Sequence, residues 1–176
     1  MMKNFEFTII ASGFDLHSNY EDALFEAGCS DATISIQKGV MIAEFDREAV
    51  SFSRAVASAC QNVHTAGFHV DRVEPDHLVS LSEIAERANL SRQAISLYIK
   101  GERSSGFPTP AAKVTSKHPL WDWHEVASWL HEKNFVEREV VIQAQIVKEA
   151  NICIASSEIP HDGFFARLEK CEAGAF

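Results

Sequence analysis

The stretch LSEIAERANLSRQAISLYI, residues 81–99, predicts two short helices joined by a tight turn. Ser80 and Glu83 have the S-x-x-E spacing of a capping box, in which each side chain bonds a free backbone amide at the start of a helix. Ala85 is small where the two helices would cross. Asn89 lies where the turn needs a left-handed backbone, which asparagine tolerates better than most residues. We therefore expect a helix-turn-helix unit here.

The second helix of this unit has a recognisable start, inner face and end. Ser91 is suited to cap it, and Gly101 is suited to end it. Ile95 and, one turn later, Tyr98 or Ile99 are expected to point inward. This assignment leaves four polar side chains on the outer face of the helix: Arg92, Gln93, Ser96 and Lys100.

That outer face has the chemistry of a DNA-recognition helix. Arg92 and Gln93 stand at its N-terminal end, where arginine can grip guanine and glutamine can grip adenine through paired hydrogen bonds. Lys100, and Ser91 with the free amides of the helix start, suit phosphates. An ordinary packed helical corner needs the same small and apolar residues, but it does not explain why the exposed side chains are basic or amide.

The distribution of charge along the chain supports the same interpretation. The 176 residues carry 16 Lys and Arg against 25 Asp and Glu, a net charge of −9 that taken whole counts against a nucleic-acid partner. Residues 1–79 account for 5 − 12 = −7, residues 80–118 for 6 − 3 = +3 and residues 119–176 for 5 − 10 = −5. The helix-turn-helix stretch is thus a basic island between acidic flanks.

The sequence after this unit, GERSSGFPTPAAKVTSKHPLWDWHEVASWL, is similar to the excisionase and AlpA-like branch of the MerR-type winged helix-turn-helix family. That family has a Phe-Pro-x-Pro segment before a short β-wing, then a tryptophan, a Glu-Val pair and a Trp-Leu pair. The resemblance covers about residues 79–131. The matching residues are Phe107, Pro108, Pro110, Trp121, Glu125, Val126, Trp129 and Leu130.

The residues 111–121 are expected to form a two-stranded wing, because the prolines hold the preceding segment extended. In the family the wing lies along the DNA backbone, so the resemblance implies phosphate contacts for Arg103, Lys113 and Lys117. We expect the three tryptophans to be core anchors of a helix that starts near Asp122, with Asp122 or Trp121 at its cap, rather than a platform for stacking bases.

The N-terminal segment predicts an α+β domain. The order strand, helix, strand, strand, helix, strand is typical of a ferredoxin-like split-βαβ sandwich, in which two helices cover one face of an antiparallel sheet. In the second helix, Val50, Ala57, Cys60 and Val63 or Val56 would form the buried stripe. The expected strands are 5–12, 32–39, 40–47 and 68–75, and the expected helices are 19–28 and 49–66.

The C-terminal segment predicts one longer helix, residues 135–155, with a wide apolar face. Such a helix either packs on its own domain or pairs with a second copy, and we expect a homodimer formed through this helix or through the N-terminal sheet. Phe164, Phe165 and Leu168 could dock as a final turn. The expected domains are a ferredoxin-like domain (1–78), a winged helix-turn-helix domain (79–133) and a C-terminal helix and tail (134–176).

These patterns predict a sequence-specific double-stranded DNA-binding protein, a transcription regulator such as a repressor. An excisionase-like architectural factor, and an antitoxin-like protein or adaptor whose N-terminal domain binds a protein partner, remain alternatives, and that domain could instead sense a small ligand. The four cysteines form no CxxC pair and are expected to be ordinary thiols. We expect no enzyme activity, cofactor or metal, and a cytoplasmic location with no membrane span.

Overall fold

The computed structural model describes residues 1–15, 17–156 and 162–174 and has a mixed α+β fold, as the sequence predicts. The chain divides into two compact units, one formed by Met1–Pro75 with Ile146–Phe176 and the other by Asp76–Gln145. This division differs from the three segments expected from the sequence, since the long C-terminal helix contributes its first part to one unit and its last part to the other.

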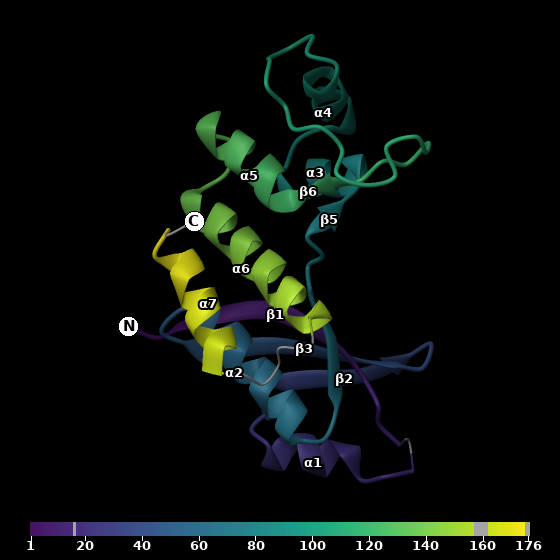
Figure 1. Cartoon of the computed structure of the whole chain (residues 1–176), viewed down its shortest axis with the longest axis vertical. Helices are drawn as coiled ribbons and strands as arrows, with labels where there is room; N and C mark the ends of the chain where they lie inside the picture. Colours follow the sequence, from purple (N-terminus) through teal and green to yellow (C-terminus); the bar gives the residue numbers. More distant parts are fainter. Residues whose placement is uncertain (16, 157–161, 175–176) are drawn as a thin grey trace. The chain divides into compact units, whose positions relative to one another are not determined.

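The first unit is built on a four-stranded sheet (Figure 1). The strand order is β2-β3-β1-β4, and all neighbouring strands are antiparallel. β1 and β2 are therefore parallel with β3 between them. Its elements are β1 (Lys3–Ser12), α1 (Tyr20–Glu26), β2 (Ala32–Gln37), β3 (Val40–Ala49), α2 (Phe52–Thr65), β4 (His69–Glu74), the end of α6 (Arg138–Ala155) and α7 (Asp162–Glu172).

One face of this sheet is apolar because side chains alternate along each strand. Phe7 of β1 and Phe45 of β3 lie opposite each other, with their rings stacked 5.4 Å apart. Phe52 of α2 meets Phe7 edge-on at 5.9 Å. The other face of β3 carries exposed acids, Glu44 and Asp46 among them. The sheet thus buries one face under α2, and β3 presents acids on the other face.

α2 is buried on more than one side, whereas the sequence predicts a single buried stripe. Ser51 caps it by accepting a hydrogen bond from the Arg54 amide at 3.3 Å. Val50 consequently lies before the helix and is 56% exposed, so its predicted place in the buried stripe is wrong. α7 packs on α2, and the expected docking of the tail is confirmed for Phe164 and Leu168, which are buried.

A buried arginine joins the end of β3 to its surroundings. The Arg47 guanidinium is held in two hydrogen bonds by the Asp31 carboxylate, at 2.7 and 2.9 Å. It also donates to Asn62 Oδ1 at 2.8 Å, Ser58 Oγ at 3.0 Å and the Gly28 carbonyl oxygen at 2.8 Å. Arg47 is therefore a fully bonded structural residue linking β3, α2 and the turn before β2, since buried charges need this degree of pairing.

Replacing Asp31 by asparagine tests how this ion pair responds to acid. Burial alone would raise the Asp31 pKa, but the hydrogen bond and charge of Arg47 outweigh burial and hold it below its ordinary 3.8. A carboxyl whose pKa is lower in the folded state stabilises the fold above its unfolded pKa, and this stabilisation is lost as the pH falls through the folded pKa. We expect the free energy of unfolding to drop more in the wild type than in Asp31→Asn as the pH falls from about 5 through the folded pKa, which lies below 3.8.

Urea unfolding at each pH measures this difference. Glu26→Gln is the matched control, because Glu26 is exposed on α1 and has no bonding partner among the described residues. The control should keep the pH dependence of the wild type. If Asp31→Asn instead kept the pH dependence of the wild type, the Asp31–Arg47 ion pair would not contribute to the pH dependence of stability as proposed.

Candidate nucleic-acid interface

The second unit is a small helical core closed by a two-stranded sheet. Its elements are β5 (Leu78–Val79), α3 (Leu81–Arg87), α4 (Arg92–Ile99), β6 (Trp121–Asp122), α5 (Trp123–Glu132) and the start of α6. β5 and β6 are antiparallel, with Val79 opposite Trp121. This pairing holds the segment before α3 beside the segment before α5. Val79 and Trp121 both belong to the hydrophobic core of this unit.

The first helix and the turn form as the sequence predicts. The Ser80 hydroxyl accepts from the Glu83 amide at 3.3 Å, and the Glu83 carboxylate accepts from the Ser80 amide at 2.7 Å, which confirms the capping box. Ala85 is buried in the hydrophobic core of this unit. Asn89 has a φ of 51°, so the left-handed turn is confirmed. These local interactions fix the entry into α4.

α4 exposes one arc of its surface and buries the opposite arc. Ser91 caps it by accepting from the Ala94 amide at 3.1 Å, and Ala94, Ile95 and Tyr98 are buried. At 100° per residue, these three occupy one side of the helix. The opposite arc, also about 100° wide, carries all four predicted outer residues: Arg92, Gln93, Ser96 and Lys100.

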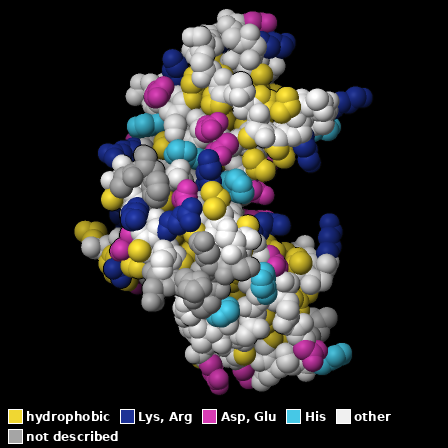
Figure 2. Space-filling model, in the orientation of Figure 1, with side chains coloured by type: hydrophobic (Ala, Val, Ile, Leu, Met, Phe, Trp, Pro, Cys, Tyr) yellow, Lys and Arg dark blue, Asp and Glu magenta, His cyan; other side chains and the backbone are white. Residues whose placement is uncertain are grey.

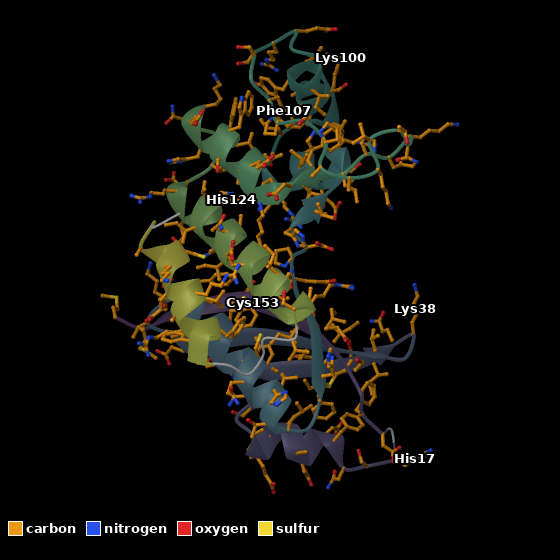
Figure 3. The ribbon with its side chains drawn as sticks, viewed as in Figure 1. His17, Lys38, Lys100, Phe107, His124 and Cys153 are labelled. Atoms are coloured by element: carbon orange, nitrogen blue, oxygen red, sulfur yellow. The ribbon has the colours of Figure 1, made fainter. Side chains whose placement is uncertain are left out.

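The side chains on this outer arc are available to a ligand. Arg92, Gln93 and Lys100 are exposed and Ser96 is half-buried. Within the described part of the chain, the side chains of Arg92, Gln93 and Lys100 make no hydrogen bond or ion pair. Figure 3 shows Lys100 at the C-terminal end of α4. The arc thus presents cationic and amide donors that bond no acceptor among the described residues.

The tryptophans hold the segment that follows α4 against the core. The Trp129 ring lies 5.1 Å from Tyr98 and 5.1 Å from Phe107, and its Nε1 donates to the Ser105 carbonyl oxygen at 3.3 Å. Trp121 Nε1 donates to the Pro108 carbonyl oxygen at 3.2 Å. All three tryptophans are buried, which confirms their prediction as core anchors.

The start of α5 resolves the choice of cap that the sequence left open. Asp122 is the N-cap, since its carboxylate accepts from the amides of His124 at 2.9 Å and Glu125 at 3.2 Å. Trp121, the other candidate, pairs with β5 instead.

The expected wing is a short hairpin loop rather than two full strands. Ala112 and Leu120 form a single antiparallel bridge, with hydrogen bonds of 2.9 and 3.1 Å. Lys113 turns to a φ of 51° directly after the bridge, and Trp121 pairs with Val79 of β5 on the other side. The hairpin therefore stops at one bridge, and the two-stranded prediction is corrected to this shorter form.

Two lysines project from this hairpin loop. Lys113 and Lys117 are exposed, as are the residues between them. Neither lysine forms an ion pair with another residue that the structure describes. In Figure 2, Lys and Arg side chains stand out from the end of α4 and from this loop. Both predicted phosphate-binding lysines are thus free to meet an anion.

The two remaining arginines of the basic island, Arg103 and Arg87, differ in how far their side chains are engaged by other residues of the unit. The Arg103 guanidinium lies over the Tyr98 ring at 5.6 Å and remains exposed, so it adds charge beside the end of α4. Arg87 lies over Trp123 at 5.1 Å and donates to the Asp76 carbonyl oxygen at 3.1 Å. Burial lowers the pKa of Arg87. Arg87 is therefore used internally, which the charge count alone could not show.

The described residues offer no evident reactive centre. Mainly through burial, the pKa of Cys29 and of Cys171 rises to about 11, and that of Cys60 to about 12, so these thiols are uncharged near neutral pH. No group of three or more His, Cys, Asp or Glu side chains that could hold a metal lies within the described ranges. None of the helices described is long and apolar enough to cross a membrane.

Comparison of the chain with protein-family models, curated proteins and solved structures finds no match.

The turn at Asn89 gives a direct test of the helix-turn-helix geometry. The left-handed backbone conformation destabilises a residue other than glycine by about 1–2 kcal/mol, and it destabilises asparagine less than alanine. We expect Asn89→Ala to lower the free energy of unfolding by about 1 kcal/mol. Asn89→Gly is the matched control and should equal or exceed the wild type, as measured by thermal or urea unfolding. Equal stability of the two variants would contradict the strained turn.

Proposed function

We propose that the chain is a sequence-specific double-stranded DNA-binding protein that regulates transcription. In this proposal residues 76–145 act as a winged helix-turn-helix domain, with α4 as the recognition helix and the hairpin loop as a reduced wing. The first unit is then a ferredoxin-like sandwich, which the β-α-β-β-α-β order and the strand order β2-β3-β1-β4 support.

The observation that carries the proposal is the outer arc of α4. A recognition helix needs a buried face that fixes its orientation and an exposed face whose N-terminal residues reach base edges. α4 has both, since Ile95 and Tyr98 are buried while Arg92 and Gln93 are exposed at the N-terminal end. Arg92 is suited to the acceptors of guanine, and Gln93 to the donor and acceptor of adenine.

The other cationic side chains are suited to the phosphate backbone. Lys100 and Arg103 follow one another at the end of α4, and Lys113 and Lys117 extend from the hairpin loop. The Ser91 hydroxyl and the first amides of α4 add hydrogen-bonding groups at the other end of the helix. Such contacts position a protein on DNA, whereas base contacts specify the sequence.

Acidic surroundings limit how strongly this interface binds DNA of any sequence. The chain as a whole is at −9, and β3 presents exposed acids on one face of the sheet in the first unit. A net negative protein is repelled by DNA at long range, while a local cationic patch binds at short range. Discrimination between sequences then depends more heavily on Arg92 and Gln93.

Binding to duplex DNA should weaken steeply with salt. Each neutralised phosphate contributes about −0.9 to the slope of log affinity against log salt, so four phosphate-binding cations predict a slope of about −3.6. Footprinting and gel-shift titration on the DNA upstream of the chain's own coding sequence measure both site and slope. Absence of binding to any fragment of that region at low salt would overturn the proposal.

Two substitutions should have different effects. Arg92→Ala removes a base contact, so it should cost about 1–3 kcal/mol at the preferred site and relax sequence preference. Lys117→Ala removes a phosphate contact, so it should weaken all sequences alike and reduce the salt slope by about 1.

Lys170→Gln is the matched control for loss of one positive charge. Lys170 is exposed on α7, outside the proposed interface. The Lys170→Gln substitution should change neither the preferred DNA site nor the slope of log affinity against log salt. An Arg92→Ala variant with an unaltered footprint would contradict the role of α4.

A further inference from the structure

The two edges of the four-stranded sheet are finished in different ways. At β4, the Asn151 side chain of α6 takes the place of a further strand. The Val73 amide donates to Asn151 Oδ1 at 2.8 Å, and Asn151 Nδ2 donates to the Val73 carbonyl oxygen at 3.0 Å. A bulge between Ile10 and Ala11 also distorts the pairing with β4. This edge is closed to another strand.

The opposite edge strand, β2, contains none of the protective features that a strand can carry in its own sequence or pairing. Its sequence ATISIQ contains no charged residue and no proline, and its pairing with β3 has no bulge. Natural sheets commonly protect an exposed edge with lysine, proline, a bulge or a covering segment. The edge that lacks these devices is therefore suited to pair with another strand.

The backbone groups of β2 that face outward can be identified from the hydrogen-bond pattern. The Asp46 amide donates to the Asp31 carbonyl oxygen at 3.1 Å, so this pair is a hydrogen-bonded one. Bonded and non-bonded pairs alternate in an antiparallel ladder. Thr33 and Ser35 thus bond β3, while Ile34 and Ile36 turn their N–H and C=O groups to the open edge.

The side chains of this edge are also incompletely covered. Ile34 and Ile36 lie on the same face of the sheet as the buried Ala43 and Met41 of β3, their register partners. They are nevertheless only half-buried, because β2 is the edge strand of the sheet in the part of the chain that the structure describes. An added strand would cover apolar area as well as satisfy backbone groups.

We propose that β2 pairs with β2 of a second copy of this chain, antiparallel, about a two-fold axis beside Ile34, so that Ile34 lies opposite Ile34 of the second copy. Charge restricts where two copies can meet, since residues 1–79 carry −7 and repel a second copy wherever acids face each other, whereas the β2 edge is neutral and permits close approach. Like strands also match in shape, because each brings half-buried isoleucines to the same face. The two sheets then form one continuous sheet, and the dimer is isologous.

Charge substitution at the edge tests this pairing without disturbing the core. Thr33 and Ser35 point to the face of the sheet that carries the exposed acids of β3, away from the buried face. In an antiparallel pair centred on Ile34, Thr33 of one copy lies opposite Ser35 of the other on the same face of the sheet, so like charges at these positions meet across the interface. Thr33→Lys/Ser35→Lys and Thr33→Glu/Ser35→Glu should each weaken self-association by about tenfold or more.

Mixing the two double variants in equal amounts should restore association, because opposite charges then face each other. Sedimentation equilibrium of the full chain without DNA gives the mass directly. We expect the wild type and the mixture at twice 19.6 kDa and each double variant alone at 19.6 kDa. Circular dichroism confirms that each variant is folded.

Gln61→Lys/Thr65→Lys is the matched control, since it adds two positive charges to exposed positions of α2. It should remain dimeric. A monomeric wild type at micromolar concentration, an undiminished dimer of the double-lysine variant, or a mixture that stays monomeric would each overturn the pairing. These measurements contain no DNA, so their outcome is independent of the proposed DNA binding.

Discussion

The burial of one side of α4 is the constraint on which the candidate interface depends. Ile95 and Tyr98 must enter the tryptophan core, and a helix that fixes two residues one turn apart has no freedom left to rotate. Arg92 and Gln93 are exposed for that reason and not because of their own preferences. The same core holds Phe107, so the cationic loop after α4 is fixed by the contact that orients the helix.

Features set by neighbouring residues could be predicted from the sequence. The capping box at Ser80, the left-handed Asn89 and the cap at Ser91 each depend on groups within a few positions, and all three are present in the structure. The alternation along β1 and β3 is equally local, because it follows from the pleat of a strand.

Features set by distant partners could not be predicted. The length of the hairpin depends on β5, which takes Trp121 as its partner from 42 positions away. The role of Arg87 depends on Trp123 and Asp76, so its charge was counted with the basic island although it is used internally. The second buried side of α2 depends on α7, which begins nearly a hundred residues later. Periodicity within one segment contains no information about such partners.

The hydrogen bonds from the Trp121 and Trp129 indoles have a thermodynamic consequence. They hold the backbone at Pro108 and Ser105 in place before any ligand arrives. Docking on a polyanion would then immobilise a few long side chains but would order little main chain, so the entropic cost is that of rotamers. Association of this kind lacks the large negative heat-capacity change that accompanies folding upon binding, which distinguishes a preformed basic surface from an arm that orders only on its target.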